Sequence, residues 1–279
     1  MPFSIASNVP SLIAQRNLSR QQEGYERAIE RLSSGYRVNS ASDDPAGVAV
    51  ISRLSARISG LGAATRNANT GLSMAETAEG SLAEMTTVVD RMRELAVEAS
   101  NGVLTSADRT LLDTEFAELI EEVDRIASAS DHGTTELLSG ASVTYSYQVG
   151  AEAGATTLDV TFGAISTTTL AISTSTLSGS GTKNASDAIT AIDLALETIN
   201  TRRASFGGAV SAFEFSISHN NTLSTNLEES LSRLRDADIA EESALLARYK
   251  VMIEAGAAVL AQANQLPSIT LALLGVSGT

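Results

Sequence analysis

Histidine and acidic side chains are the groups in this sequence with the clearest capacity for chemistry. The two histidines, His132 and His219, stand far apart in the chain. No His-Glu-x-x-His motif, Gly-x-Ser-x-Gly elbow or phosphate-binding glycine loop accompanies them, although metal and acid–base chemistry needs such groups in combination. Cysteine is absent, which excludes thiolate metal sites, disulfides and a cysteine nucleophile. We therefore expect no enzyme, no cofactor and no metal centre.

Carboxylates gather in two places that are almost 200 residues apart in the sequence. Asp43 and Asp44 precede Pro45 in the first cluster, and the second cluster contains Asp236, Asp238, Glu241 and Glu242. Such groups are potential calcium ligands, but no glycine-bearing calcium loop follows either cluster. Helix caps and salt bridges are the favoured interpretation, because Gly35 suits a helix end and an Asp before Pro45 suits a helix start.

Composition narrows the choice of partners. The chain has 279 residues, 33 acidic against 19 basic side chains and a net charge of −14, which argues against nucleic-acid binding. No run of 18 uncharged apolar residues is present, and the first residues lack a basic segment followed by an apolar one. These facts alone indicate a cytoplasmic protein, but a protein that leaves the cell through a dedicated channel would look the same.

Proline spacing and apolar periodicity predict very long helices. More than 200 consecutive residues separate Pro45 from Pro267, and apolar residues recur at steps of three and four between them. The pattern predicts helices around 46–99 and 185–235, each roughly 75–80 Å long. Two such rods must lie side by side, so we expect a mainly α fold, an elongated antiparallel bundle of coiled-coil-like helices.

The two chain ends carry helical patterns with more apolar surface than one partner helix can cover. Near the N-terminus the pattern consists of Leu18, Tyr25, Ile29 and Leu32. The C-terminal segment has one seam of Leu246, Tyr249, Ile253, Gly256, Leu260 and Ala263, and a second of Leu245, Met252, Val259 and Leu266. Because a face with two seams is too wide for one helix, these ends predict association with further copies.

The composition changes between Ser139 and Lys183, where Ser, Thr and Gly dominate. Alternating apolar residues over 143–149 and 158–162 predict two strands joined as a hairpin. The stretch 167–180 is either a further strand or a flexible loop. We expect this insert to cap the far end of the helices and to divide the chain into end helices (1–44 with 237–279), a rod (45–140 with 183–236) and an exposed insert (141–182).

Four segments give the sequence a family resemblance. They are RLSSGYRVNSASDDPAG (31–47), DRMRELAVEASNG (90–102), SRLRDADIAEE (232–242) and LAQANQLP (260–267). Together they resemble bacterial flagellin, in the right order and at opposite ends of the chain. The resemblance implies a secreted, extracellular protein of the bacterial flagellum that assembles with copies of itself into the hollow filament used for motility.

The resemblance also implies roles for particular residues. The end helices would form an inner tube, and the rods would form a tube around it. Filament assembly would rest on Leu18, Tyr25, Ile29, Leu32, Leu246, Tyr249, Ile253, Leu260 and Leu266. The spoke between the tubes and the inter-subunit contacts would involve Arg31, Arg37, Asp43, Asp44, Arg235, Asp236 and Asp238. In the spoke that the resemblance implies, Arg31 or Arg37 would pair with an acid.

Further partners enter through the resemblance alone. They are the flagellar export apparatus, a chaperone on the C-terminal helix, the filament cap and the hook-junction proteins. Arg91, Leu95 and Glu115 match positions that the vertebrate Toll-like receptor for flagellin contacts. Two alternatives to a filament subunit stay open: a hook–filament junction protein, and a surface glycan-binding protein that uses Tyr145, Tyr147 and Phe162 of the insert.

Overall fold

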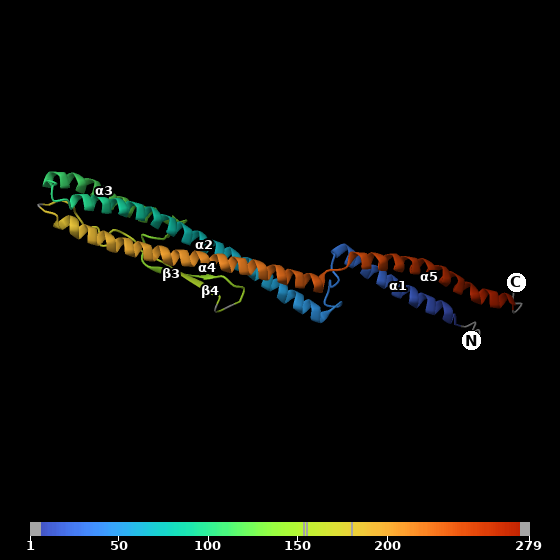
Figure 1. Ribbon diagram of the computed structural model, residues 1–279. Coiled ribbons are helices and arrows are strands. Elements are labelled where there is room, and N and C mark those ends of the chain that lie inside the picture. The colour runs from blue at the N-terminus through green and yellow to red at the C-terminus, as the bar shows by residue number, and fades with distance from the viewer. Residues whose placement is uncertain (1–6, 153, 155, 180, 274–279) are drawn as a thin grey trace. The chain divides into compact units, whose positions relative to one another are not determined.

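The structure is a computed structural model that describes residues 7–152, 154, 156–179 and 181–273, with side chains up to residue 265. Long helices dominate the described residues (Figure 1). They are α1 (Val9–Ser34), α2 (Pro45–Ala99), α3 (Ser106–Ala129), α4 (Lys183–Arg235) and α5 (Ile239–Leu273). The expected mainly α fold, with long antiparallel helices and a small hairpin, is confirmed. Within the described residues, no helix combines the length and apolar character needed to cross a membrane.

Two compact units divide the chain. The first consists of Met1–Ala56 and Leu227–Thr279, and the second of Arg57–Asn226. In the first unit α1 and α5 run antiparallel, since Gly24 packs against the ring of Tyr249 while Leu18 approaches Gly256. Small residues at these two points let the helices approach each other closely, as an alternation of large and small side chains allows.

The second unit contains the main core. α2 and α4 are antiparallel, because Arg93 pairs with Asp193 (2.7 Å) while Glu79 pairs with Arg203 (2.8 Å). The buried side of α4 repeats every seven residues, which keeps one seam against α2. Its members, all no more than 2% exposed, are Ala185, Ile192, Ile199, Phe206 and Phe213. α3 folds back along α2 and is joined to it by an Arg91–Glu115 ion pair (2.8 Å).

The predicted hairpin is present, but its position corrects our expectation. β3 (Val143–Gln148) pairs antiparallel with β4 (Thr157–Phe162). The Tyr147 ring packs edge-on against Phe213 of α4 at 5.3 Å, and its hydroxyl lies 3.1 Å from the sulfur of Met74 in α2. These contacts place the hairpin along the sides of α2 and α4 rather than over their ends (Figure 1), because burying the inward rows of the strands requires the long apolar faces of the helices.

The described part of 163–182 is neither a strand nor a loose loop. It is a series of turns whose apolar side chains Leu170, Ile172 and Leu177 are buried. Thr167 and Thr176 donate hydrogen bonds to Asp124 and Asp113 of α3 (2.7 and 2.9 Å).

A short ladder that the sequence did not predict precedes the hairpin. β1 (Asp131–His132) pairs with β2 (Thr135–Glu136) around Gly133, whose φ of +69° suits a tight turn. His132 therefore lies in a two-residue strand.

Candidate functional site

The end helices place the predicted seam between them. Most of its members are half-buried: Leu18, Tyr25, Leu32, Leu246, Tyr249, Ile253 and Leu260. Ile29 is 43% exposed, and the side chain of Leu266 lies outside the described residues. Near the start of α1, the Asn8 amide donates to the carbonyl of Ala263, and the Ser11 hydroxyl donates to the Asn264 side chain (2.9 and 2.7 Å). Apolar packing and these two hydrogen bonds fix the register of the pair.

Part of the apolar surface of this pair has no partner within the described residues. On α5, Val251, Met252 and Val259 are 62%, 44% and 59% exposed. On α1, Leu12 is 60% and Ile13 is 44% exposed. Met252 and Val259 belong to the second C-terminal seam, so the two-seam pattern corresponds to one covered and one uncovered side of α5. Clustered exposed apolar side chains of this kind mark interaction surfaces.

The two connections next to this pair form a crossover, which we define as residues 35–44 together with 236–238. Tyr36 forms an isolated antiparallel bridge with Asp236. The Arg37 N–H donates to the Arg235 carbonyl, and the Ala237 N–H donates to the Gly35 carbonyl (2.6 and 2.9 Å). The Arg235 guanidinium also lies 4.1 Å from the centre of the Tyr36 ring, a cation–π contact. The two connections are thus held together by backbone and side chain.

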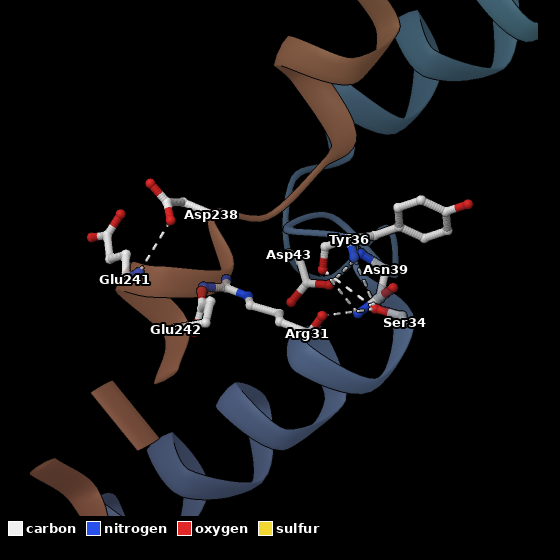
Figure 2. Close-up of polar contacts among 8 residues, drawn as sticks. All are labelled: Arg31, Ser34, Tyr36, Asn39, Asp43, Asp238, Glu241 and Glu242. Carbon is white, nitrogen blue, oxygen red and sulfur yellow. Dashed lines mark hydrogen bonds and ion pairs between the residues drawn. The ribbon is translucent and has the colours of Figure 1, made fainter. Parts of the chain in front are cut away.

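An ion pair joins α1 to α5 beside the crossover (Figure 2). Nη1 of Arg31 lies 3.0 Å from Oε1 of Glu242, whose side chain is only 8% exposed. Of the two arginines expected to pair with an acid, Arg31 does so, whereas Arg37 donates to the carbonyl of Leu234 (2.6 Å). A buried carboxylate is tolerated only with such a partner, so Glu242 depends on Arg31.

Three carboxylates of the crossover accept local hydrogen bonds: two of them cap helices, and the third closes a turn. Asp44 accepts from the Gly47 N–H at the start of α2 (2.8 Å), and Asp238 accepts from the Ala240 N–H at the start of α5 (2.8 Å). Asp43 accepts from the backbone and hydroxyl of Ser40 (2.9 and 3.1 Å), hydrogen bonds that hold the pKa of its carboxyl below the usual value. Figure 2 shows Asp43 folded back over its own turn and Asp238 at the helix start.

Two features complete the electrostatics of the crossover. Asp236 lies 3.4 Å from the Arg235 guanidinium. Gly35 ends α1 with a φ of +75°, as predicted for a helix-ending glycine. Among the residues that the structure describes, no group of three or more acidic or histidine side chains is arranged to hold a metal ion.

The three residues that match receptor-contact positions differ in their exposure. Arg91 and Glu115 are exposed and form the ion pair that joins α2 to α3. Leu95 is 1% exposed and belongs to the core, so the folded unit does not offer it to a receptor. This corrects the expectation for Leu95, whose position in the apolar repeat of α2 faces α3 and α4.

Two buried polar residues hold elements in place, and of these the sequence analysis missed Arg109. Arg109 is 5% exposed and donates to the carbonyls of Ala99 and Asn101 (2.8 and 3.1 Å), where α2 ends. Asn220 of α4, 3% exposed, donates to the carbonyl of Val149 next to the hairpin (2.8 Å). The polar position of Asn220 within an apolar seam was a usable signal, whereas nothing near Arg109 in the sequence distinguishes it from a solvated charge.

Comparison with known proteins agrees with this architecture. Two family models match the chain: the bacterial flagellin N-terminal helical region over residues 5–143, and the bacterial flagellin C-terminal helical region over residues 189–274. A flagellin of Halalkalibacterium halodurans is 38% identical over 97% of this chain and 99% of its own length. A flagellin of Listeria innocua is 32% identical over 98% of this chain and 99% of its own length.

A solved structure also shares the fold. The structure of a putative flagellar hook-associated protein from Vibrio parahaemolyticus superposes with a TM-score of 0.59 at 16% identity, over 70% of this chain and 100% of that one. At this identity the likeness concerns the fold alone. The two family models and the near-full-length relatives decide the assignment: the chain belongs to the bacterial flagellin family.

Proposed function

We propose that the α1–α5 pair is the surface through which this chain polymerises. As a flagellin, the chain is a structural subunit of the extracellular flagellar filament, the propeller of bacterial motility. The observation that carries the proposal is the uncovered apolar side of the pair, with Leu12, Val251 and Val259 each about 60% exposed. Fully burying one such side chain stabilises an assembly by about 1.5–3 kcal/mol, and neighbouring copies supply the missing cover.

We expect filament growth from this surface to be nucleated, because the apolar burial gained among copies must offset the backbone entropy lost when the end helices become ordered. Ordering a residue costs roughly 1–2 kcal/mol of backbone entropy, and one helix partner covers only part of the apolar surface of α1 and α5. Residues 1–44 and 237–279 should therefore order fully only among copies. In this arrangement they form the inner tube, the rod of 45–140 with 183–236 surrounds it, and the insert of 141–182 faces outward.

The crossover acts as the spoke between the two tubes. Its hydrogen bonds and the Arg31–Glu242 pair hold the two connections together beside the end helices. Asp43, Asp236 and Asp238 are exposed, so one face of each remains available to a neighbouring copy. Helix capping by Asp44 and Asp238 and closure of the turn by Asp43 then come first. Inter-subunit contacts use what these hydrogen bonds leave exposed.

Further partners follow from the same role. Export through the flagellar channel, a chaperone on the uncovered side of α5, addition beneath a filament cap and contact with hook-junction proteins all suit a filament subunit. Absence of disulfides suits a chain that is threaded unfolded. The exposed Arg91–Glu115 pair is what the folded unit offers to a Toll-like receptor.

Neither alternative is favoured. The likeness to a hook-associated protein concerns the fold alone, whereas identity over nearly the whole chain is to flagellins. For a glycan-binding insert, aromatic platforms would have to be exposed. Phe162 is 1% exposed and Tyr147 packs against Phe213, so these rings serve the core.

Seeded polymerisation of the full chain tests the proposal. The double variant Met252→Ser/Val259→Ser removes apolar surface from the uncovered side of α5 and should abolish filament growth while leaving the helical circular dichroism of the rod intact. Ala261→Ser, an exposed small residue on the opposite side of α5, is the matched control and should polymerise normally. Filaments formed equally well by all three chains would exclude this surface as the assembly site.

A further inference from the structure

The connection between α2 and α3 contains the one Asn-Gly pair of the sequence, Asn101 and Gly102. Both residues are exposed to water. An asparagine side chain is open to attack by the backbone nitrogen of the next residue, and glycine hinders that approach least because it has no Cβ. The sequence therefore singles out this pair for a reaction that the fold either allows or prevents.

The folded turn leaves the attacking nitrogen of Gly102 unoccupied. On one side of it the Asn101 N–H donates to the carbonyl of Glu98 (3.0 Å), and on the other the Val103 N–H donates to Oδ1 of Asn101 (3.2 Å). The Gly102 N–H itself donates to no residue that the structure describes. Its proton is thus accessible to a base from solvent.

The side chain of Asn101 is held next to this nitrogen. Its hydrogen bond from the Val103 N–H closes an Asx turn, a ring that curls the side-chain amide back toward the peptide of Gly102. The same N–H points at the amide oxygen, where negative charge develops when the amide carbon is attacked, so it stabilises that charge. The turn therefore brings the two reacting groups together and polarises one of them.

We propose that Asn101 is a site of spontaneous deamidation in the folded chain. Hydroxide removes the Gly102 N–H proton, and the nitrogen then forms a bond to Cγ of Asn101. The bond from Cγ to Nδ2 breaks, and the leaving nitrogen takes a proton from water and departs as ammonia. Water next opens the five-membered succinimide at either of its two carbonyls, which gives aspartate or isoaspartate at position 101.

A second exposed turn shows how the fold prevents the same reaction. Asn39 is also followed by a small residue, Ser40, in the crossover. There the Ser40 N–H donates to Oδ2 of Asp43 (2.9 Å), so the attacking nitrogen is occupied. The leaving amide of Asn39 is held as well, because it donates to the carbonyl of Tyr36 (3.3 Å; Figure 2). The contrast between the two turns makes Asn39 an internal control.

The isoaspartate product has a specific partner in Arg109. This arginine is 5% exposed, and its Nη2 donates to the backbone carbonyl of Asn101 (3.1 Å). In isoaspartate the chain continues through the side-chain carbon, and that backbone carbonyl becomes a free carboxylate. A guanidinium binds a carboxylate more strongly than it binds a neutral carbonyl. The modification therefore adds one negative charge at the point where Arg109 receives it.

Peptide mapping by mass spectrometry tests the proposal on the full chain, incubated in mildly alkaline buffer. We expect conversion of amide to acid at Asn101, with Asn39 unchanged, and labelling of residue 101 by an isoaspartate-specific methyltransferase. The rate should rise with pH, because the deprotonated nitrogen attacks. Gly102→Ala should lower the rate at Asn101 about tenfold, since the added Cβ hinders the attack.

The variant preserves the turn, because a Cβ at Gly102 would meet nothing within 4 Å. Gly80→Ala is the matched control, since a Cβ at Gly80 has the same open space, and it should leave the rate at Asn101 unchanged. In urea, which frees the Ser40 N–H, the share of conversion at Asn39 should rise. An intact Asn101, a rate insensitive to Gly102→Ala, or the same ratio of conversion at the two asparagines in folded and unfolded chain would overturn the inference.

Discussion

At the scale of single residues, the Arg31–Glu242 pair has the largest consequence for assembly. Replacing Glu242 with Ala removes a partner from Arg31 inside the α1–α5 contact and should lower the filament's dissociation temperature. The cost should be about 1–3 kcal/mol per subunit, below that of a fully buried pair because Arg31 remains 31% exposed. Light scattering during heating measures the change. Glu241→Ala, at the exposed neighbouring position, should cost a few tenths of this, and equal effects of both variants would contradict the assigned role.

A second residue prediction concerns pH. The Thr105 hydroxyl and N–H donate to Asp108 (2.7 and 2.9 Å), and these hydrogen bonds lower the pKa of Asp108 in the folded chain. A lowered folded-state pKa contributes stability above the unfolded pKa, and this contribution is lost as pH falls through the folded pKa. Thermal unfolding should show Asp108→Asn less stable than the unaltered chain at pH 7. The difference should shrink as pH falls below the ordinary carboxyl pKa and should vanish once pH is below the lowered pKa of Asp108 in the folded chain; a difference independent of pH would contradict the mechanism.

Residue contacts were predictable from sequence where they are local. Gly35 and Asp44 act at helix ends within a few positions of themselves, and their chemistry is readable from neighbouring residues. The partner of Arg31 is 211 residues away, so the sequence indicated an acidic partner without choosing it. Arg109 and Leu95 show the limit: their burial depends on how α3 folds back on α2, which neither residue type reveals.

At the scale of elements, two glycines of α2 predict opposite effects of the same substitution. A Cβ at Gly71 would collide with the Phe213 ring, whereas a Cβ at Gly80 would meet nothing within 4 Å. Gly71→Ala should destabilise the second unit by about 1–3 kcal/mol, because the core must shift. Gly80→Ala should stabilise it by about 1 kcal/mol through helix propensity. Thermal unfolding distinguishes them, and shifts of the same sign would contradict the packing of α2 on α4.

The helices and the hairpin were predictable as elements because their periods differ. Apolar residues at steps of three and four predicted α2 and α4, and alternating apolar and polar residues predicted β3 and β4. Their mutual placement was not predictable, since the sequence does not say that Tyr147 meets Phe213. The apolar residues of the turns in the described part of 163–182 follow no helical or strand period. The burial of Leu170 and Ile172 was therefore not predictable and is seen only in the tertiary structure.

At the scale of the whole molecule, we propose that the chain is an incomplete structure that its copies complete. The second unit buries its apolar seam within one chain, whereas the α1–α5 pair leaves Leu12, Val251 and Val259 exposed. Stability of the end helices should therefore depend on chain concentration, as binding to further copies shifts their folding equilibrium.

Amide hydrogen exchange, measured on monomer and on filament of the same chain, tests this claim most directly. We predict that residues 9–34 and 239–265 exchange rapidly in the monomer and become strongly protected in the filament, while residues 57–99 and 183–226 are protected in both. Equal protection of the end helices in monomer and filament would contradict the account.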